Sequence, residues 1–361
     1  MMAVRPVPET GPLVLGILYP TAWFGDETAL AEEIATVMAI DPRLEVCTIT
    51  YDEPHDLRTL RGRAGGAEVS RELAPALTAE QREMFAKVHG VVALDLPFDV
   101  GTVAPNLTWV QGVGAGSAQL QSAGLGDAGI RLTTSAGSNA VAIAEFVVGR
   151  VLQERKRFRE IDEHQRRHEW ADLYGTELAG ATIGLIGLGA INAAVAARLA
   201  AFGVTVLASR RSARPGDTAP NIAELYPTDR LHEMFARCDT VISAVPETPE
   251  TIGLIDATAI AAMRSGAFFV NVGRGTLLDE PALIDALVSG HLRGAALDVA
   301  SEEPLPAGNP LWDAPNLYLS FHCSSSPAAL FINLHRLWRD NITSWLAGGE
   351  LRNEVDLTRG Y

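Results

Sequence analysis

The chain has 361 residues, more than one typical domain, so we expect two domains. Hydrophobic residues make up 47% of it, which is enough for well-packed cores. The formal net charge at pH 7 is −15, and the isoelectric point lies near 5.0. An acidic surface of this kind repels phosphate groups, so nucleic acids and anionic membranes are excluded as expected partners.

The three cysteines are widely spaced and form no CxxC pattern, which argues against both a disulfide framework and a zinc site. We therefore expect no bound metal. The N-terminal stretch MMAVRPVPETGP lacks the apolar core of a signal peptide, so a cytoplasmic protein is expected. Glycines interrupt the weakly charged stretch 180–208, which we interpret as strand, turn, helix and strand rather than as a membrane span.

The first third of the chain alternates short apolar runs with a helical pattern. Strands that alternate with helices indicate a parallel sheet covered on both faces. The polar stretch Asp52–Ala79 is interpreted as a loop or an insertion, and no role is assigned to it. Strands are predicted at residues 13–18, 44–49, 91–94 and 107–111, and a helix at residues 28–40.

A second domain is predicted to begin near residue 138. The apolar runs VTVLAS, TVISAV, AFFVNV, GAALDV and LYLSF then recur between helical patterns, which is typical of a doubly wound α/β domain. After Pro327 the sequence predicts an amphipathic helix that packs back on the first domain. We therefore predict a discontinuous first domain, residues 1–137 and 328–361, around a second domain of residues 138–327.

The sequence GLGAIN at residues 187–192 has the pattern of a phosphate-binding turn. Gly187 permits the tight turn after the strand 181–186, and Gly189 lets the backbone approach a pyrophosphate. The helix that follows points its free N–H groups at that anion. Asn192 replaces the usual third glycine, so we expect this helix to sit slightly further from the strand.

The end of the next strand carries no carboxylate for a ribose 2′-hydroxyl. Ser209, Arg210 and Arg211 stand there instead, with Arg214 close by. Guanidinium groups suit a 2′-phosphate, which favours NADP(H) over NAD(H), with NAD(H) as the second possibility. A solvated basic loop is the alternative interpretation.

Three segments that follow predicted strands carry the residues that hydride chemistry on a keto acid requires. Arg274 lies between two glycines, where its guanidinium can bind a carboxylate and polarise a carbonyl. His322 can donate a proton near neutral pH, and a neighbouring carboxylate would raise its pKa. The segment ALDVASEEPLP offers that carboxylate from Asp298, Glu302 or Glu303.

These segments occur in the order found in the D-isomer-specific 2-hydroxyacid dehydrogenase family, which the chain resembles from about Pro105 to Ser326. The motifs are TWVQGVGAG, AIAEFVV, ELAGATIGLIGLGAIN, SAVPETPETIGLI, VNVGRGTLLDE, GAALDVASEEPLP and LYLSFHCSSS. The resemblance implies a Rossmann nucleotide-binding domain inserted into a flavodoxin-like substrate domain. It also implies Arg274 as the substrate binder, His322 as the acid/base and Glu303 as its partner, with Glu302 as the alternative.

The resemblance further implies binding residues. Backbone N–H groups of Ala115 and Gly116 would hold the substrate carboxylate from the other domain, and Asp298 would contact the nicotinamide carboxamide. The full set of implied cofactor contacts is Gly187, Gly189, Ala190, Ile191, Ser209, Arg210, Arg211, Val245, Pro246, Thr251, Val272, Gly273, Asp298 and Ser324.

The sequence departs from the family pattern at Phe321, where proline is common, and at Ser117 and Ala118 after GVGAG. Cys323 follows His322, but neighbouring side chains on an extended strand end point apart, so covalent catalysis is not expected. We predict a homodimeric reductase that transfers hydride between NADP(H) and a small 2-keto acid such as glyoxylate or hydroxypyruvate. The alternative is a non-catalytic nucleotide-sensing protein on the same scaffold.

Overall fold

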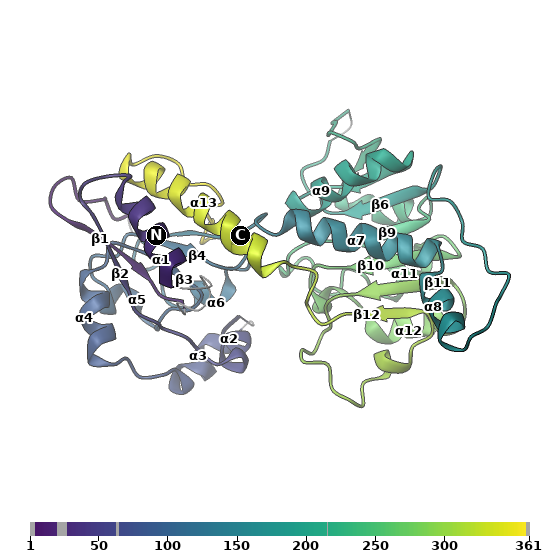
Figure 1. Ribbon diagram of the computed structural model, residues 1–361, viewed down its shortest axis with the longest axis horizontal. Coiled ribbons are helices and arrows are strands. Elements are labelled where there is room, and N and C mark those ends of the chain that lie inside the picture. The colour runs from purple at the N-terminus through teal and green to yellow at the C-terminus, as the bar shows by residue number, and fades with distance from the viewer. Residues whose placement is uncertain (1–3, 20–26, 63–64, 215, 359–361) are drawn as a thin grey trace. The chain divides into compact units, whose positions relative to one another are not determined.

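The computed structural model describes residues 4–19, 27–62, 65–214 and 216–358. The chain divides into two compact units, residues 1–138 with 327–361 and residues 139–326. Each unit contains one parallel sheet with helices packed on it (Figure 1). The predicted fold class of two parallel-sheet α/β domains is therefore confirmed.

The sheet of the first unit has the strand order β2-β1-β3-β4-β5, which is the order of flavodoxin-like folds. All its described pairs are parallel. The strands are β1 Leu13–Ile17, β2 Leu44–Thr48, β3 Gly90–Ala93, β4 Trp109–Gly112 and β5 Arg131–Thr133. The helices are α1 Glu27–Met38, α2 His55–Gly62, α3 Gly66–Ser70, α4 Ala79–Lys87, α5 Val100–Val103, α6 Ala118–Gln121 and α13 Pro327–Leu346.

Successive strand residues supply two hydrophobic cores, one on each face of this sheet. Val91 belongs to a cluster with Phe85 of α4, whereas its neighbour Val92 belongs to a cluster with Trp338 of α13. The second cluster also contains residues of α1, which lies beside α13 on the same side of the sheet (Figure 1). The C-terminal helix thus packs on the first unit, as its amphipathic pattern predicts.

The interpretation of Asp52–Ala79 as a loop was wrong, because the structure places α2 and α3 there. Two arginines of α2 pair with buried carboxylates of neighbouring segments. Arg58 donates from Nε to Oδ1 of Asp95 at 2.8 Å, and the buried Arg61 forms an ion pair with the buried Glu53. A hydrophobic pattern cannot reveal a helix that is held by ion pairs.

The sheet of the second unit has the order β12-β11-β10-β9-β6-β7-β8, again with parallel pairs. The strand order reverses between β6 and β9, as in doubly wound nucleotide-binding folds. The strands are β6 Thr182–Ile186, β7 Thr205–Ser209, β8 Glu224–Tyr226, β9 Thr240–Ser243, β10 Ala267–Asn271, β11 Leu292–Leu297 and β12 Leu317–Leu319.

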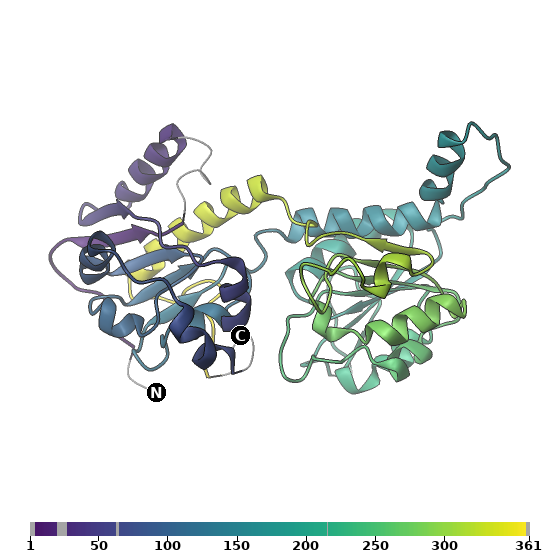
Figure 2. The ribbon, with the colours of Figure 1, turned by 90° about the horizontal axis from the view of Figure 1, so that it is seen from below.

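Helices cover both faces of this second sheet. One hydrophobic cluster joins the strands to α7 Ala140–Arg155 and α9 Ala190–Leu199. The other joins them to α10 Leu231–Phe235, α11 Ala257–Ala262 and α12 Glu280–Val288. Helix α8 Phe158–Arg166 and the segment after it project from the body of this unit (Figure 2). None of the helices in the described part of the chain combines the length and hydrophobicity needed to cross a membrane.

Candidate active site

The predicted site residues of the second unit gather at the carboxyl edge of its sheet. Gly187 follows β6, Arg274 follows β10, and His322 follows β12. Parallel strands end at the same edge, so the alternation of strands and helices brings these segments together.

The turn after β6 has the geometry of a phosphate cradle. Gly187 adopts φ +78°, and a β-carbon there would lie 2.3 Å from Cγ1 of Val245, so the position requires glycine. Gly189 is the N-cap of α9, and open space surrounds the position of its absent β-carbon. Ala190 and Ile191 form the first turn of that helix, whose free N–H groups suit a pyrophosphate.

Asn192 has a role that the sequence did not predict. Its side chain is fully buried, and Nδ2 donates to the carbonyl oxygens of Ile186 at 2.9 Å and Gly187 at 2.6 Å. The amide therefore fixes the end of β6 and the glycine turn. A third glycine would leave those two carbonyl groups without this donor.

The end of β7 carries the predicted ribose-reading residues. Buried Ser209 accepts a hydrogen bond at Oγ from the N–H of Gly187 at 3.0 Å, so it is tied directly to the glycine turn. Arg210 is partly exposed and donates from Nη2 to Oδ2 of Asp217 at 3.1 Å. Arg211 is exposed on the same loop. A serine with two arginines fits a nucleotide that carries a 2′-phosphate.

Arg274 lies on a loop whose backbone is held by a buried asparagine. Asn271 donates from Nδ2 to the carbonyl of Arg274 at 2.9 Å and accepts from the N–H of Gly273 at 3.0 Å. A β-carbon at Gly275 would lie 1.8 Å from the carbonyl carbon of Ala300. The loop of Arg274 therefore packs backbone to backbone on the segment that leads to the carboxylates of 302–303.

Glu303, rather than Glu302, is the carboxylate paired with His322. His322 Nδ1 and Glu303 Oε2 lie 2.8 Å apart, and Glu303 Oε1 accepts from the N–H of Ala300 at 3.0 Å. The bond to Glu303 raises the pKa of His322 and outweighs the opposing effects of burial and of Arg274. Burial alone would raise the pKa of Glu303, but the bonds from His322 and Ala300 lower it. The pair thus favours imidazolium beside carboxylate.

Asp298 holds the segment that carries the histidine. Its buried carboxylate accepts from Ser320 Oγ at 2.7 Å and from the N–H groups of Cys323 and Ser324 at 3.0 and 3.1 Å. Its carbonyl accepts from the N–H of His322 at 2.7 Å. These bonds support a left-handed backbone at His322, with φ +53°. This positioning role was missed, and the contact of Asp298 with a nicotinamide stays a prediction.

The remaining predicted contacts lie on turns next to these segments. Thr251 Oγ1 donates to the carbonyl of Pro246 at 2.7 Å and thereby shapes the turn after β9 that carries Val245. Val272 is buried directly after β10. In the first unit, Ala115 and Gly116 lie in the turn between β4 and α6.

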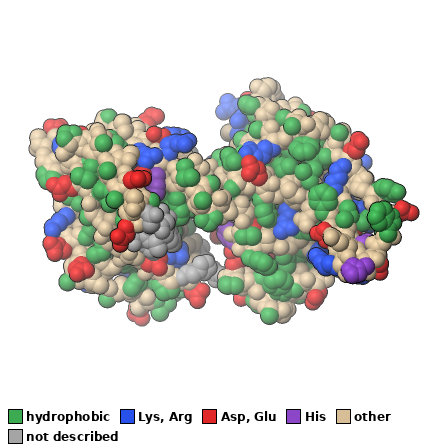
Figure 3. Space-filling model, in the orientation of Figure 1, with side chains coloured by type: hydrophobic (Ala, Val, Ile, Leu, Met, Phe, Trp, Pro, Cys, Tyr) green, Lys and Arg blue, Asp and Glu red, His purple; other side chains and the backbone are tan. Residues whose placement is uncertain are grey.

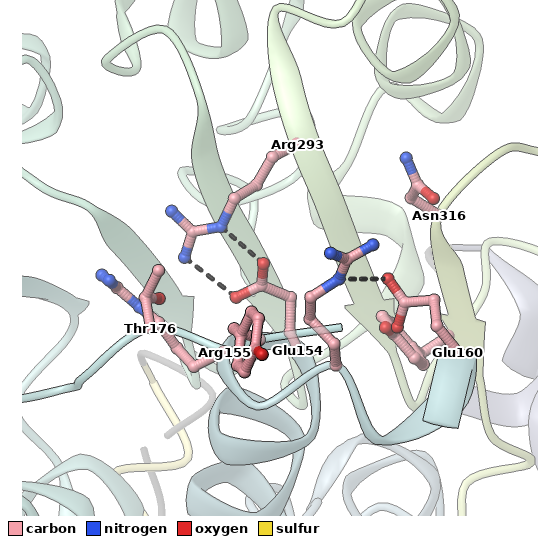
Figure 4. Close-up of a pocket in the computed structure, with 9 residues that line it drawn as sticks. Glu154, Arg155, Glu160, Thr176, Arg293 and Asn316 are labelled. Atoms are coloured by element: carbon pink, nitrogen blue, oxygen red, sulfur yellow. Dashed lines mark hydrogen bonds and ion pairs between the residues drawn. The ribbon is translucent and has the colours of Figure 1, made fainter. Parts of the chain in front are cut away.

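A separate pocket of the second unit lies at the opposite, amino edge of its sheet, where Arg293 is the second residue of β11 and Asn316 precedes β12 (Figure 4). Its volume is about 330 Å³. Arg293 pairs there with Glu154 through two bonds of 2.7 and 3.0 Å. Ligands of doubly wound sheets bind at the carboxyl ends of the strands, so we do not assign the reaction to this pocket at the amino edge.

The described residues contain no group of three or more His, Cys, Asp or Glu side chains arranged to hold a metal ion. The carboxyl edge of the sheet combines a glycine turn suited to a nucleotide phosphate, the guanidinium of Arg274 and the pair of His322 and Glu303.

The chain is similar in sequence to known proteins. The family model described as the NAD-binding domain of D-isomer-specific 2-hydroxyacid dehydrogenases matches residues 148–324. The chain is 36% identical over 232 residues to D-3-phosphoglycerate dehydrogenase of Mycobacterium leprae, a match of 64% of this chain and 43% of that protein. It is 34% identical over 256 residues to glyoxylate reductase of Thermofilum pendens, a match of 69% of this chain and 75% of that protein.

A solved structure is similar over nearly the whole chain. It is the NADPH-dependent glyoxylate/hydroxypyruvate reductase of Sinorhizobium meliloti in complex with NADP and sulfate, with a TM-score of 0.72 and 26% identity. The match covers 98% of this chain and all of that one, whereas the chain spans less than half of the phosphoglycerate dehydrogenase. The chain therefore belongs to the D-isomer-specific 2-hydroxyacid dehydrogenases, a family of NAD(P)-dependent oxidoreductases.

Proposed function

We propose that the protein reduces a small 2-keto acid, such as glyoxylate or hydroxypyruvate, with NADPH and oxidises the matching D-2-hydroxy acid in reverse. The observation that carries this proposal is the 2.8 Å contact between His322 and Glu303 on the sheet edge that also holds Arg274 and the glycine turn. Family membership supports the reaction class, and the names of the glyoxylate reductase relatives support the substrate class.

The residues of the site have different tasks in this reaction. Bound NADPH supplies the hydride to the keto carbon. Arg274 binds the substrate carboxylate and stabilises negative charge on the keto oxygen. Because Glu303 occupies Nδ1 of His322, Nε2 is the atom that gives its proton to that oxygen, which becomes the hydroxyl. Backbone N–H groups of Ala115 and Gly116 are proposed to bind the same carboxylate.

We propose NADPH as the preferred donor because Ser209 replaces the carboxylate that would repel a 2′-phosphate, and Arg210 and Arg211 follow it. The similar Sinorhizobium enzyme is named as NADPH-dependent and contains NADP. The glycine turn and its neighbours at Val245, Pro246 and Thr251 fit the rest of the nucleotide.

A panel of 2-keto acids, each assayed with NADPH and with NADH, tests the proposal. We expect keto-acid-dependent oxidation with a higher kcat/KM for NADPH. Equal kcat/KM values would contradict the cofactor preference. Tight NADPH binding without turnover on any keto acid would instead support the nucleotide-sensing alternative.

The pH dependence of reduction tests the histidine–carboxylate pair. Reduction requires protonated His322, so its rate falls as pH rises through the histidine pKa, and the oxidation rate rises. Glu303 raises that pKa, so Glu303→Gln is expected to lower it and to move the decline of the reductive rate to lower pH. Glu302→Gln is the matched control and should leave the profile in place. An unmoved profile in Glu303→Gln would show that Glu303 does not set the proton affinity.

We further propose that the protein is a homodimer formed through α8 and the segment after it. Trp170 is 99% exposed and Tyr174 is 79% exposed, and apolar side chains gather on this projection (Figure 3). Thr176 anchors the segment by donating from its N–H to the carbonyl of Arg155 at 2.8 Å. Aromatic side chains that are held on a fixed projection are typical centres of protein interfaces. The cytoplasmic location stays a prediction.

Light scattering of the purified protein checks this association. Trp170→Ser is expected to weaken the dimer by about 2–4 kcal/mol, or roughly 30- to 900-fold in Kd, as for a central interface tryptophan. Val288→Ser removes another exposed apolar side chain of the same unit, on α12, and should leave the mass unchanged. A parent protein that is monomeric at all concentrations would overturn the proposal.

A further inference from the structure

The loop after β7 folds back so that a carboxylate meets the first of its arginines. Arg210 Nη2 and Asp217 Oδ2 lie 3.1 Å apart, and the same oxygen accepts from the N–H of Arg214 at 3.0 Å. The carbonyl of Arg214 in turn accepts from the N–H of Asp217 at 3.0 Å. Asp217 is therefore held in place by backbone bonds, and its charge stays beside Arg210.

Arg210 is only partly used by this contact. Its Nε atom is buried and has no hydrogen-bond partner among the described residues. Its side chain is 38% exposed and that of Asp217 is 34% exposed, so both groups can reach solvent and ligand. The exposed part of the guanidinium can thus face a second anion while Nη2 stays on the carboxylate.

The positive charge of the other arginine also acts on a carboxylate. The pKa of Glu250 is lowered, chiefly by the hydroxyl of Thr248 and its own backbone N–H, and in part by the positive charge of Arg211. Both arginines that are predicted to read the ribose therefore lie in the field of an acidic side chain. An anion that approaches them meets less net positive charge than the sequence Ser-Arg-Arg indicates.

We propose that Asp217 is a specificity-determining residue that weakens NADPH binding and thereby limits the preference for NADPH over NADH. This inference rests on the proposed use of NADP(H). A 2′-phosphate brings up to two negative charges to a guanidinium that already holds a carboxylate, and the two anions repel. NADH has a hydroxyl at that position and does not meet this repulsion. The exposed setting makes the effect moderate and sensitive to salt.

Dissociation constants for NADPH and NADH, measured by calorimetry on the parent and on Asp217→Asn, test the proposal. Asparagine retains an oxygen for the N–H of Arg214 but removes the charge. We expect the Kd for NADPH to fall roughly 3- to 10-fold at low ionic strength, less at high salt, and the Kd for NADH to change less than twofold. Glu83→Gln is the control, because it removes one negative charge from an exposed ion pair on α4 of the other unit.

Asp217→Glu keeps the charge and is expected to retain the parent ratio of the two dissociation constants. An unchanged or raised Kd for NADPH in Asp217→Asn would overturn the proposal, and so would an equal change for both nucleotides. If the Kd for NADPH fell equally in Glu83→Gln, the net charge of the protein would explain the effect, and the proposal for Asp217 would also be overturned. These constants do not require turnover, so a protein that binds NADPH but reduces no keto acid would contradict the proposed function alone.

Discussion

Replacing His322 with asparagine is expected to lower kcat for keto-acid reduction by about 10²- to 10⁴-fold, the usual contribution of a general acid. Asparagine has no proton to donate near neutral pH. It tolerates the left-handed backbone that His322 adopts at φ +53°, whereas alanine at this position would add backbone strain. Steady-state rates, together with the Kd for NADPH and the melting temperature, check the result.

The neighbouring cysteine is the control for this variant. Cys323 contacts Asp298 through its backbone N–H, a bond that Cys323→Ser retains. We expect this variant to keep a near-parental rate, which would also exclude a covalent role for the thiol. If the His322→Asn protein retained more than a tenth of the parental kcat, His322 would not be the proton donor.

Arg274→Lys is expected to lower kcat/KM for the keto acid by about 30- to 900-fold, which corresponds to a loss of roughly 2–4 kcal/mol of transition-state stabilisation. Lysine retains the charge but loses the planar pair of donors that binds carboxylate and carbonyl together. The bond from Arg274 Nη1 to the carbonyl of Gly273, at 2.7 Å, also orients the guanidinium, and a flexible ammonium would not reproduce it.

The Kd for NADPH should stay near the parental value in Arg274→Lys, because the loss concerns the substrate. Arg264→Lys, at an exposed arginine that pairs with Asp239, serves as the control and should leave kcat/KM and the Kd for NADPH unchanged. Near-parental kcat/KM in Arg274→Lys would show that another cation binds the substrate carboxylate.

Six of the seven strands described in the second unit were predicted from the sequence, and the short edge strand β8 was not. Buried parallel strands are nearly continuous apolar runs, so AFFVNV, GAALDV and LYLSF are visible as strands, and the polar residues that follow them stand out. Arg274 and His322 stand out because each lies shortly after such a run. The pattern alone left Asp298, Glu302 and Glu303 open as the carboxylate, and only the resemblance to the family favoured Glu303.

The groups that position these residues could not be predicted in the same way. Asn192 and Asn271 act through hydrogen bonds to backbone carbonyl groups of a neighbouring turn. The backbone geometry of such a turn cannot be predicted from the pattern of side chains. Asp298 joins two strand ends that are about twenty residues apart in the chain, and Asp217 meets Arg210 only after the loop folds back. Helix α2 was missed because ion pairs of Arg58 and Arg61 help to hold it beside the buried Leu57, so its sequence is mostly polar.

The placement of the reacting groups within residues 139–326 has a consequence for the evolution of such proteins. Arg274, Glu303 and His322 all belong to the unit that also contains the glycine turn, and the family match at residues 148–324 lies inside that unit. The proposed proton donor, its partner and the proposed carboxylate binder can therefore be inherited together with the proposed nucleotide site, as one contiguous piece of gene. Under the proposed function, mutations in the first unit can then change which acids are bound without any change to these three residues.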